Sequence, residues 1–194
     1  ISLNDAMHTV DGLQKLTTVY GDLILSNNPQ LQSLEGLALL QQISGSLILV
    51  QNQSIGELRG LHNLTSIGGS LFCDGNPNLT TLEALGSLGE VGEHLFVDGN
   101  DQLVTLLGFG SLTEINGSLS VANNLGLDSF DGVENLTAVG DDLIISNNIK
   151  LRSLAAFANL RAVNGTLWIS GNAELSTLMG LEDLNVIGSD IEIG

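Results

Sequence analysis

Apolar residues recur along the chain with a fixed period of 24 residues. The repeats begin, without any insertion or deletion between them, at Gly21, Gly45, Gly69, Glu93, Gly117, Asp141 and Gly165. When the repeat positions are numbered 1 to 24, positions 3, 5, 11, 14, 17, 20 and 23 are nearly always Leu, Ile, Val, Phe or Met. One repeat cannot bury these side chains alone, whereas stacked repeats bury them against each other. The pattern therefore predicts a solenoid.

The spacing within a repeat predicts its local structure. Positions 3 and 5 are apolar and alternate with positions 2, 4 and 6, which is the period of a strand with one buried face. The apolar spacing then changes to three, but Gly or Ala occupies position 16 of every repeat, which favours tight turns, short extended segments and single 3₁₀ turns over a helix. We therefore predict a mainly β protein, a parallel β-solenoid similar to leucine-rich repeats.

The same register predicts how many coils the chain forms. Residues 1–20 fit positions 5–24 of an earlier repeat, and residues 189–194 fit positions 1–6 of a later one. No shift in composition interrupts the pattern, so residues 1–194 are expected to form a single domain of about eight coils. Because the chain starts with Ile and stops within a coil, we expect it to belong to a larger multidomain protein.

Two polar columns repeat in register with the apolar ones. Position 13 is Ser or Thr in seven of eight repeats, and its hydroxyl is expected to bond the local turn. Position 8 is always asparagine, whose amide can satisfy backbone groups at a buried corner. The asparagines are Asn4, Asn28, Asn52, Asn76, Asn100, Asn124, Asn148 and Asn172.

The repeat resembles the receptor L domain, the leucine-rich module of insulin- and EGF-receptor ectodomains. The shared pattern, NLTxIGGSLxIxxNxxLxxLxGL, covers residues 63–85 and 135–157, and the resemblance extends over essentially the whole chain. It implies a right-handed solenoid of parallel strands that binds through its flat strand face, in an extracellular or cell-surface protein. The chain is more regular than animal receptor domains and lacks their paired cysteines, which fits a microbial or marine surface protein.

The outward position 4 carries the candidate binding residues. Six of its seven members in complete repeats are large and apolar: Ile24, Ile48, Phe72, Phe96, Ile144 and Trp168. Such a ladder can simply stabilise a parallel sheet. However, six coil steps correspond to about 29 Å of apolar surface with polar margins, which is typical of a protein-binding face. We hypothesise that it binds a helix, an extended segment or a second copy of the chain.

Charge narrows the possible partners. The net charge is −17, with only five Lys and Arg residues, so nucleic acid and anionic membranes are disfavoured as partners. The acidic excess favours solubility and could favour basic partners or divalent cations. The single cysteine, Cys73, occupies an inward position and is expected to be a small buried hydrophobe.

The sequence gives little support for a metal site or for catalysis. Asp74 and Asp98 occupy the same position in adjacent repeats and Asp101 is near, so the three form a weak Ca²⁺ candidate beside the alternative of ordinary solvated acids. The three histidines fall at unrelated positions and form no recognisable triad or metal spacing. We therefore predict a non-enzymatic protein without a firmly assigned cofactor.

Three functions remain open from the sequence. The first is a protein-binding or adhesion module that uses the position 4 ladder. The second is a surface that binds ice or glycan, supported by the position 13 hydroxyls and by Thr17, Thr65, Thr113 and Thr137 at position 21. The third is a structural spacer between other domains.

Overall fold

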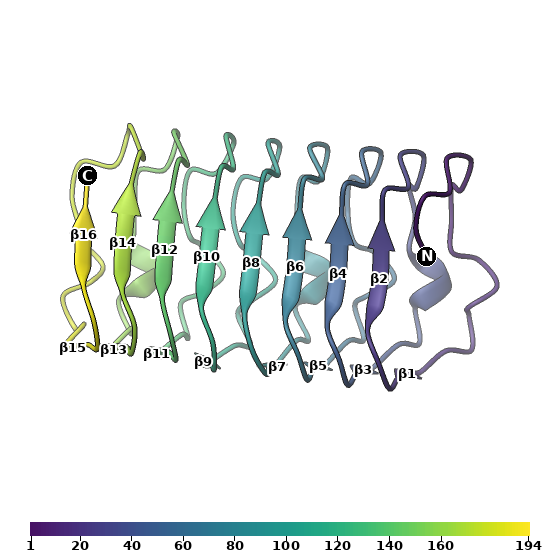
Figure 1. Ribbon diagram of the computed structural model, residues 1–194, viewed down its shortest axis with the longest axis horizontal. Helices are drawn as coiled ribbons and strands as arrows, with labels where there is room; N and C mark the ends of the chain where they lie inside the picture. The colour runs from purple at the N-terminus through teal and green to yellow at the C-terminus, as the bar shows by residue number, and fades with distance from the viewer.

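Each 24-residue repeat forms one turn of a β-solenoid in the computed structural model, which describes residues 1–194 (Figure 1). About seven turns are complete, between residues 21 and 188, and a partial turn lies at each end. The structure therefore confirms the predicted parallel β-solenoid, and the predicted number of about eight coils includes the partial turns. The N-terminus and the C-terminus lie at opposite ends of the solenoid (Figure 1).

A parallel sheet of eight strands runs along the whole solenoid (Figure 1). Positions 3 and 5 are buried and positions 4 and 6 face outward in nearly every strand, as the alternation predicts. Each strand pairs in register with the residues 24 positions away. The strands are β2 (Leu23–Ser26), β4 (Leu47–Val50), β6 (Leu71–Asp74), β8 (Leu95–Asp98), β10 (Leu119–Ala122), β12 (Leu143–Ser146), β14 (Leu167–Ser170) and β16 (Ile191–Ile193).

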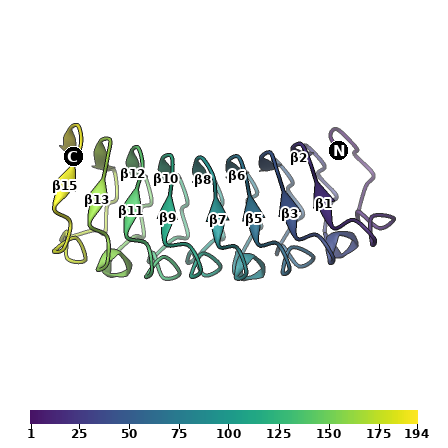
Figure 2. The same ribbon diagram turned by 90° about the horizontal axis from the view of Figure 1, so that it is seen from below.

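A second row of two-residue strands lies at positions 22 and 23, along another side of the solenoid (Figure 2). It forms two separate sheets of four strands, because β7 and β9 do not pair. The first sheet contains β1 (Thr18–Val19), β3 (Gln42–Ile43), β5 (Ser66–Ile67) and β7 (Glu90–Val91). The second contains β9 (Glu114–Ile115), β11 (Ala138–Val139), β13 (Ala162–Val163) and β15 (Val186–Ile187).

Position 16 adopts two different backbone conformations. Five of its glycines, including Gly60, have a positive φ between 105° and 129°. The two alanines at this position instead lie in 3₁₀ turns, because a residue with a Cβ rarely adopts positive φ. The three 3₁₀ turns, as anticipated from the sequence, cover positions 15–17: η1 (Glu35–Leu37), η2 (Glu83–Leu85) and η3 (Ala155–Phe157).

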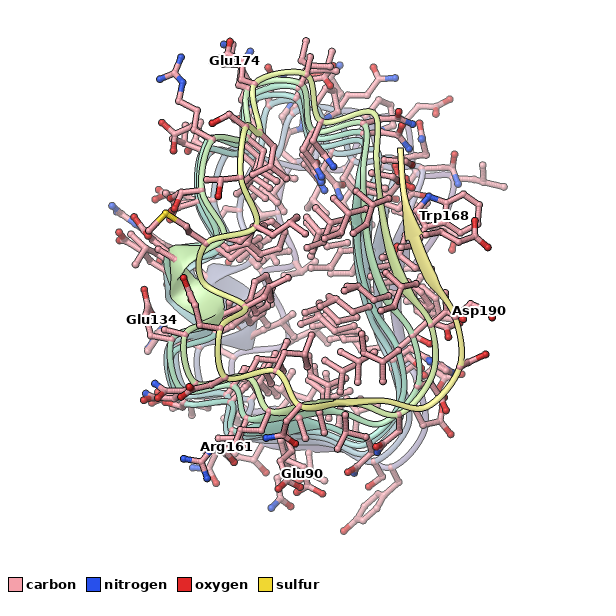
Figure 3. The ribbon with its side chains drawn as sticks, turned by 90° about the vertical axis from the view of Figure 1, so that its left-hand side faces the viewer. Glu90, Glu134, Arg161, Trp168, Glu174 and Asp190 are labelled. Atoms are coloured by element: carbon pink, nitrogen blue, oxygen red, sulfur yellow. The ribbon has the colours of Figure 1, made fainter.

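One continuous hydrophobic core fills the inside of the coil (Figure 3). It contains 46 buried residues from the apolar positions of the repeat. Phe109, Phe130 and Phe157 are fully buried, as their core positions predict, and the rings of Phe130 and Phe157 lie 4.9 Å apart between centroids. Each turn thus covers the apolar side chains of its neighbours, as a stacked repeat requires.

The position 8 asparagines form a buried hydrogen-bond ladder along the solenoid. The Oδ1 atom of Asn124 accepts the backbone N–H of Asn100 at 3.0 Å, and its Nδ2 atom donates to the carbonyl oxygen of Val97 at 2.9 Å. Every asparagine from position 8 joins this ladder, and no buried side-chain nitrogen or oxygen lacks a hydrogen-bond partner. The predicted role of this column, satisfying buried backbone groups, is confirmed.

Two neighbouring positions shape the turns around this ladder. Position 7 has a left-handed backbone in all eight turns, with φ between 55° and 68°. This conformation ends each outward strand and brings the chain to the buried asparagine. At position 13, the Ser and Thr hydroxyls accept the N–H two residues later, as between Ser153 Oγ and the Ala155 N–H at 3.1 Å, which confirms the local turn bond.

We expect Asn124→Ala to destabilise the fold strongly. The substitution removes the acceptor of the Asn100 N–H and the donor to Val97 while both groups stay buried, and each unsatisfied group costs about 1–3 kcal/mol. Urea unfolding should therefore show a loss of about 3 kcal/mol or more. The matched control is Asn159→Ala, which removes one exposed bond to the carbonyl of Glu134 and should cost about 1 kcal/mol or less. Equal losses would contradict a structural role of the buried column.

Candidate functional site

The outward side of the eight-stranded sheet, which we call the strand face, is formed by positions 2, 4 and 6. Position 4 residues are direct partners across the sheet from Ile24 to Trp168. Figure 3 shows Trp168 on the outer side of its strand, away from the core. Ile24 and Trp168 are 38% and 43% exposed, and the residues between them are half-buried by their neighbours in the row. We call Ile24, Ile48, Phe72, Phe96, Ile144 and Trp168 the apolar stripe.

The structure therefore brings the six predicted binding residues into one row. Only Ser120 on β10 interrupts the row, between Phe96 and Ile144. Ser120 keeps the same strand pairing as its apolar neighbours, so the sheet accepts a polar residue at this position. The stripe thus consists of an aromatic and aliphatic part on β2 to β8 and a second part on β12 and β14.

Aromatic rings are ordered against each other on β6 and β8. Phe72 and Phe96 stack with their centroids 5.1 Å apart and an interplanar angle of 24°. His94 stacks on Phe96 at 5.4 Å between centroids, which sequence reasoning missed. The indole Nε1 of Trp168 donates to Ser170 Oγ at 2.6 Å, so this side chain is also held in place. Such preorganised rings lose little side-chain entropy when they bind.

Position 2 forms a second hydrogen-bond ladder, which was not predicted from the sequence. Asp22 Oδ1 accepts the N–H of Ser46 at 2.8 Å, and His94 Nδ1 accepts the N–H of Ser118 at 2.9 Å. The sequence contained a signal for this ladder. The residues at position 2 in the complete repeats are Asp, Ser, His or Thr, and all of these can accept a hydrogen bond. His94 therefore has a structural role in the sheet as well as its stacking contact.

Asp74 and Asp98 are direct partners on β6 and β8. Partial burial, and then the charge of Asp98, raise the pKa of the Asp74 carboxyl. Asp98 Oδ1 accepts a hydrogen bond from Asn123 Nδ2 at 2.9 Å, which stabilises its carboxylate. Asp101 does not complete a Ca²⁺ site with them, because no group of three or more acidic, His or Cys side chains lies in position to hold a metal ion.

Cys73 lies directly beneath this part of the strand face. Its side chain is fully buried, as its inward position predicts. Burial raises the pKa of the Cys73 thiol to about 12. Its sulfur receives a contact from Asn76 Nδ2 at 3.7 Å, so it belongs to the core and to the asparagine ladder.

The remaining candidate groups lie away from the strand face. His8 is exposed and its Nδ1 donates to the carbonyl oxygen of Ala6 at 2.9 Å, and His62 lies in a surface hollow with Glu57 and Glu83. The ion pairs Arg59–Glu57, at 3.0 Å, and Arg152–Glu174, at 2.6 Å, are also on other sides of the coil. None of these residues adds a catalytic group to the stripe.

The Ser and Thr hydroxyls at position 13 and two Thr hydroxyls at position 21 form hydrogen bonds with the backbone of the protein. Position 13 hydroxyls accept backbone N–H groups, and at position 21 Thr65 and Thr137 donate to carbonyl oxygens of the preceding turn at 3.0 Å. At position 21 the donors of Thr65 and Thr137 are therefore occupied, whereas most position 13 hydroxyls act as acceptors and keep their O–H donors.

Comparisons with protein-family models, curated protein sequences and solved structures find no match for this chain. The resemblance to receptor L domains accordingly stays a prediction. No helix of the structure has the length and apolar character needed to cross a membrane.

We expect Cys73 to resist alkylation by iodoacetamide in the folded protein at mildly alkaline pH. The thiolate is the reactive form, and the buried thiol with a pKa of about 12 stays protonated there. Mass spectrometry of timed samples should show modification only at the rate of unfolding, and rapid modification in concentrated urea. Equal rates in the two solutions would contradict a buried Cys73.

We expect Asp74→Asn to stabilise the protein at neutral pH by up to about 1 kcal/mol, the range of cross-strand pairs. The folded-state pKa of Asp74 is raised above its ordinary value of 3.8, so ionisation favours the unfolded state. The contribution of Asp74 to stability therefore falls as pH rises from 3.8 through the folded pKa.

Urea unfolding at several pH values measures this effect, and the stability difference between variant and wild type should shrink as pH falls towards 3.8 and become independent of pH well below it. Asp101→Asn is the control, because Asp101 is exposed outside the strand face and its replacement should change stability by about 0.5 kcal/mol or less. A destabilised Asp74→Asn variant at neutral pH would refute the assignment.

Proposed function

We propose that the chain is a non-enzymatic protein-binding module that binds its partner through the apolar stripe of the strand face. The observation that carries this proposal is the row of Ile24 to Trp168, interrupted only by Ser120, which lies along one side of the solenoid without a covering element. Contiguous apolar surface with polar margins is characteristic of protein interfaces, whose centres are enriched in aromatic residues.

Two features favour this function over simple stabilisation of the sheet. Ser120 occupies the same position with unchanged pairing, so the ladder does not require an apolar residue there. All three aromatic residues that do not lie in the core or at a turn stand in the stripe: Phe72, Phe96 and Trp168. Residues of this kind supply most of the binding energy in known interfaces.

We also propose that the protein acts at the cell surface or outside the cell. The resemblance to receptor L domains supports a place at the cell surface or outside the cell, as one part of a larger protein. The second candidate, a surface that binds ice or glycan, has weaker support, because only four repeats carry a threonine at position 21 and two of these, Thr65 and Thr137, donate to the backbone of the protein.

The test replaces Phe72, Phe96 and Trp168 together by Ser. Short random peptides selected on the immobilised wild-type chain should lose most of their binding to this variant, because the aromatic anchors are gone. Sedimentation of the chain alone tests binding of a second copy through the same residues. Protection of Cys73 from alkylation verifies that the variant is folded.

The matched control replaces three exposed apolar residues on other sides of the coil, Leu39, Val104 and Leu107, by Ser. This variant should bind the selected peptides as the wild type does. If both variants bind equally and neither changes self-association, the stripe is not a binding surface.

A further inference from the structure

The strand face carries charges of one sign only. Positions 2, 4 and 6 contain no Lys or Arg in any repeat, and the five basic residues of the chain all lie at other positions. The acids at these positions are Asp22, Asp74, Asp98, Asp142, Asp190 and Glu192. A partner that covers the apolar stripe therefore meets a field of negative charge at its margins.

These acids differ in the hydrogen bonds that their carboxylates accept. Asp22 and Asp142 accept backbone N–H groups of the next turn, so their carboxylates take part in the position 2 ladder. Asp98 accepts from Asn123. The Asp74 carboxylate accepts no hydrogen bond and faces Asp98 directly across the sheet. The carboxylates of Asp190 and Glu192 also accept no hydrogen bond, but of these three acids only Asp74 faces another carboxylate across the sheet.

The stacked rings lie on the same two strands as this acidic pair. Phe72 precedes Asp74 by two residues on β6, and Phe96 precedes Asp98 by two residues on β8, so all four side chains face outward. A cation near aromatic rings and carboxylates is attracted by both the ring quadrupoles and the negative charges. An arginine suits such a place, because its planar guanidinium stacks on rings and bonds carboxylates with several donors.

We propose that the partner is a protein segment with apolar side chains along the stripe and an Arg or Lys side chain that binds between the Phe72–Phe96 pair and the Asp74–Asp98 pair. This inference rests on the proposed function, because it names the chemistry of the partner at the same surface. Charge complementarity selects this occupant over a second copy of the chain, whose own strand face is equally acidic and would repel. Partial burial and, after it, the charge of Asp98 raise the pKa of Asp74, and the cation offsets the second of these two causes.

The experiment uses the short random peptides selected on the wild-type chain. Their sequences should be enriched in Arg and Lys next to apolar residues, and their affinity should fall with added salt. Asp74→Asn combined with Asp98→Asn should weaken their binding by about tenfold, since a cation at such a site contributes on the order of 1–2 kcal/mol. The Asn side chains keep an acceptor for Asn123, so the fold is retained.

The control is Glu35→Gln combined with Glu83→Gln, which changes the net charge equally on the side of the 3₁₀ turns. Peptides that need the apolar stripe but show no basic enrichment, or that respond equally to both double variants, would overturn this inference and leave the proposed function standing. Peptides that bind the Ser triple variant as well as the wild type would overturn both.

Discussion

The structure depends on keeping one buried asparagine at the same place in every turn. Its side-chain oxygen accepts a backbone N–H from one neighbouring turn, and its nitrogen donates to a strand carbonyl. These partners exist only if the next turn has the same length. A one-residue insertion would leave buried polar groups without partners, at about 1–3 kcal/mol each, and would turn the strand over. The constant period of 24 residues is the result.

This constraint separates the repeat positions that must form a particular hydrogen bond from those that need not. Position 2 must accept a hydrogen bond from the next turn, which Asp22 and His94 both do. Position 4 has no such hydrogen bond to accept, and Ser120 keeps the same strand pairing as its apolar neighbours, so the backbone does not require an apolar residue there. The proposal of a binding stripe therefore rests on a position that the backbone leaves unconstrained.

The sequence predicted the parts of the structure that follow from side-chain period: the outward strands, the core and the asparagine column. It did not reveal the position 7 conformation, because Gln51 and Leu3 adopt the left-handed backbone alongside the expected Asn and Gly. Short extended segments were predicted after the outward strand, but the sequence did not show that positions 22 and 23 pair as strands between turns. The row of six stripe residues was predicted, whereas the stacking of His94 depends on side-chain direction, which the sequence does not give. Asp74 and Asp98 are direct partners, as their shared position predicts, but the structure does not gather Asp101 with them into a group that could hold a metal ion.

Local inconsistency in an otherwise regular structure points to function. Inside the coil every buried polar side-chain atom has a partner, and the apolar positions form one core. On the strand face, by contrast, Asp74 faces a like charge without a hydrogen bond, and the adjoining aromatic rings remain partly exposed. The repeat offers neutral choices at the same position, such as Ser26 and Ser146. In the complex that we propose, a basic side chain bound between the two facing carboxylates and the two stacked rings would offset this repulsion.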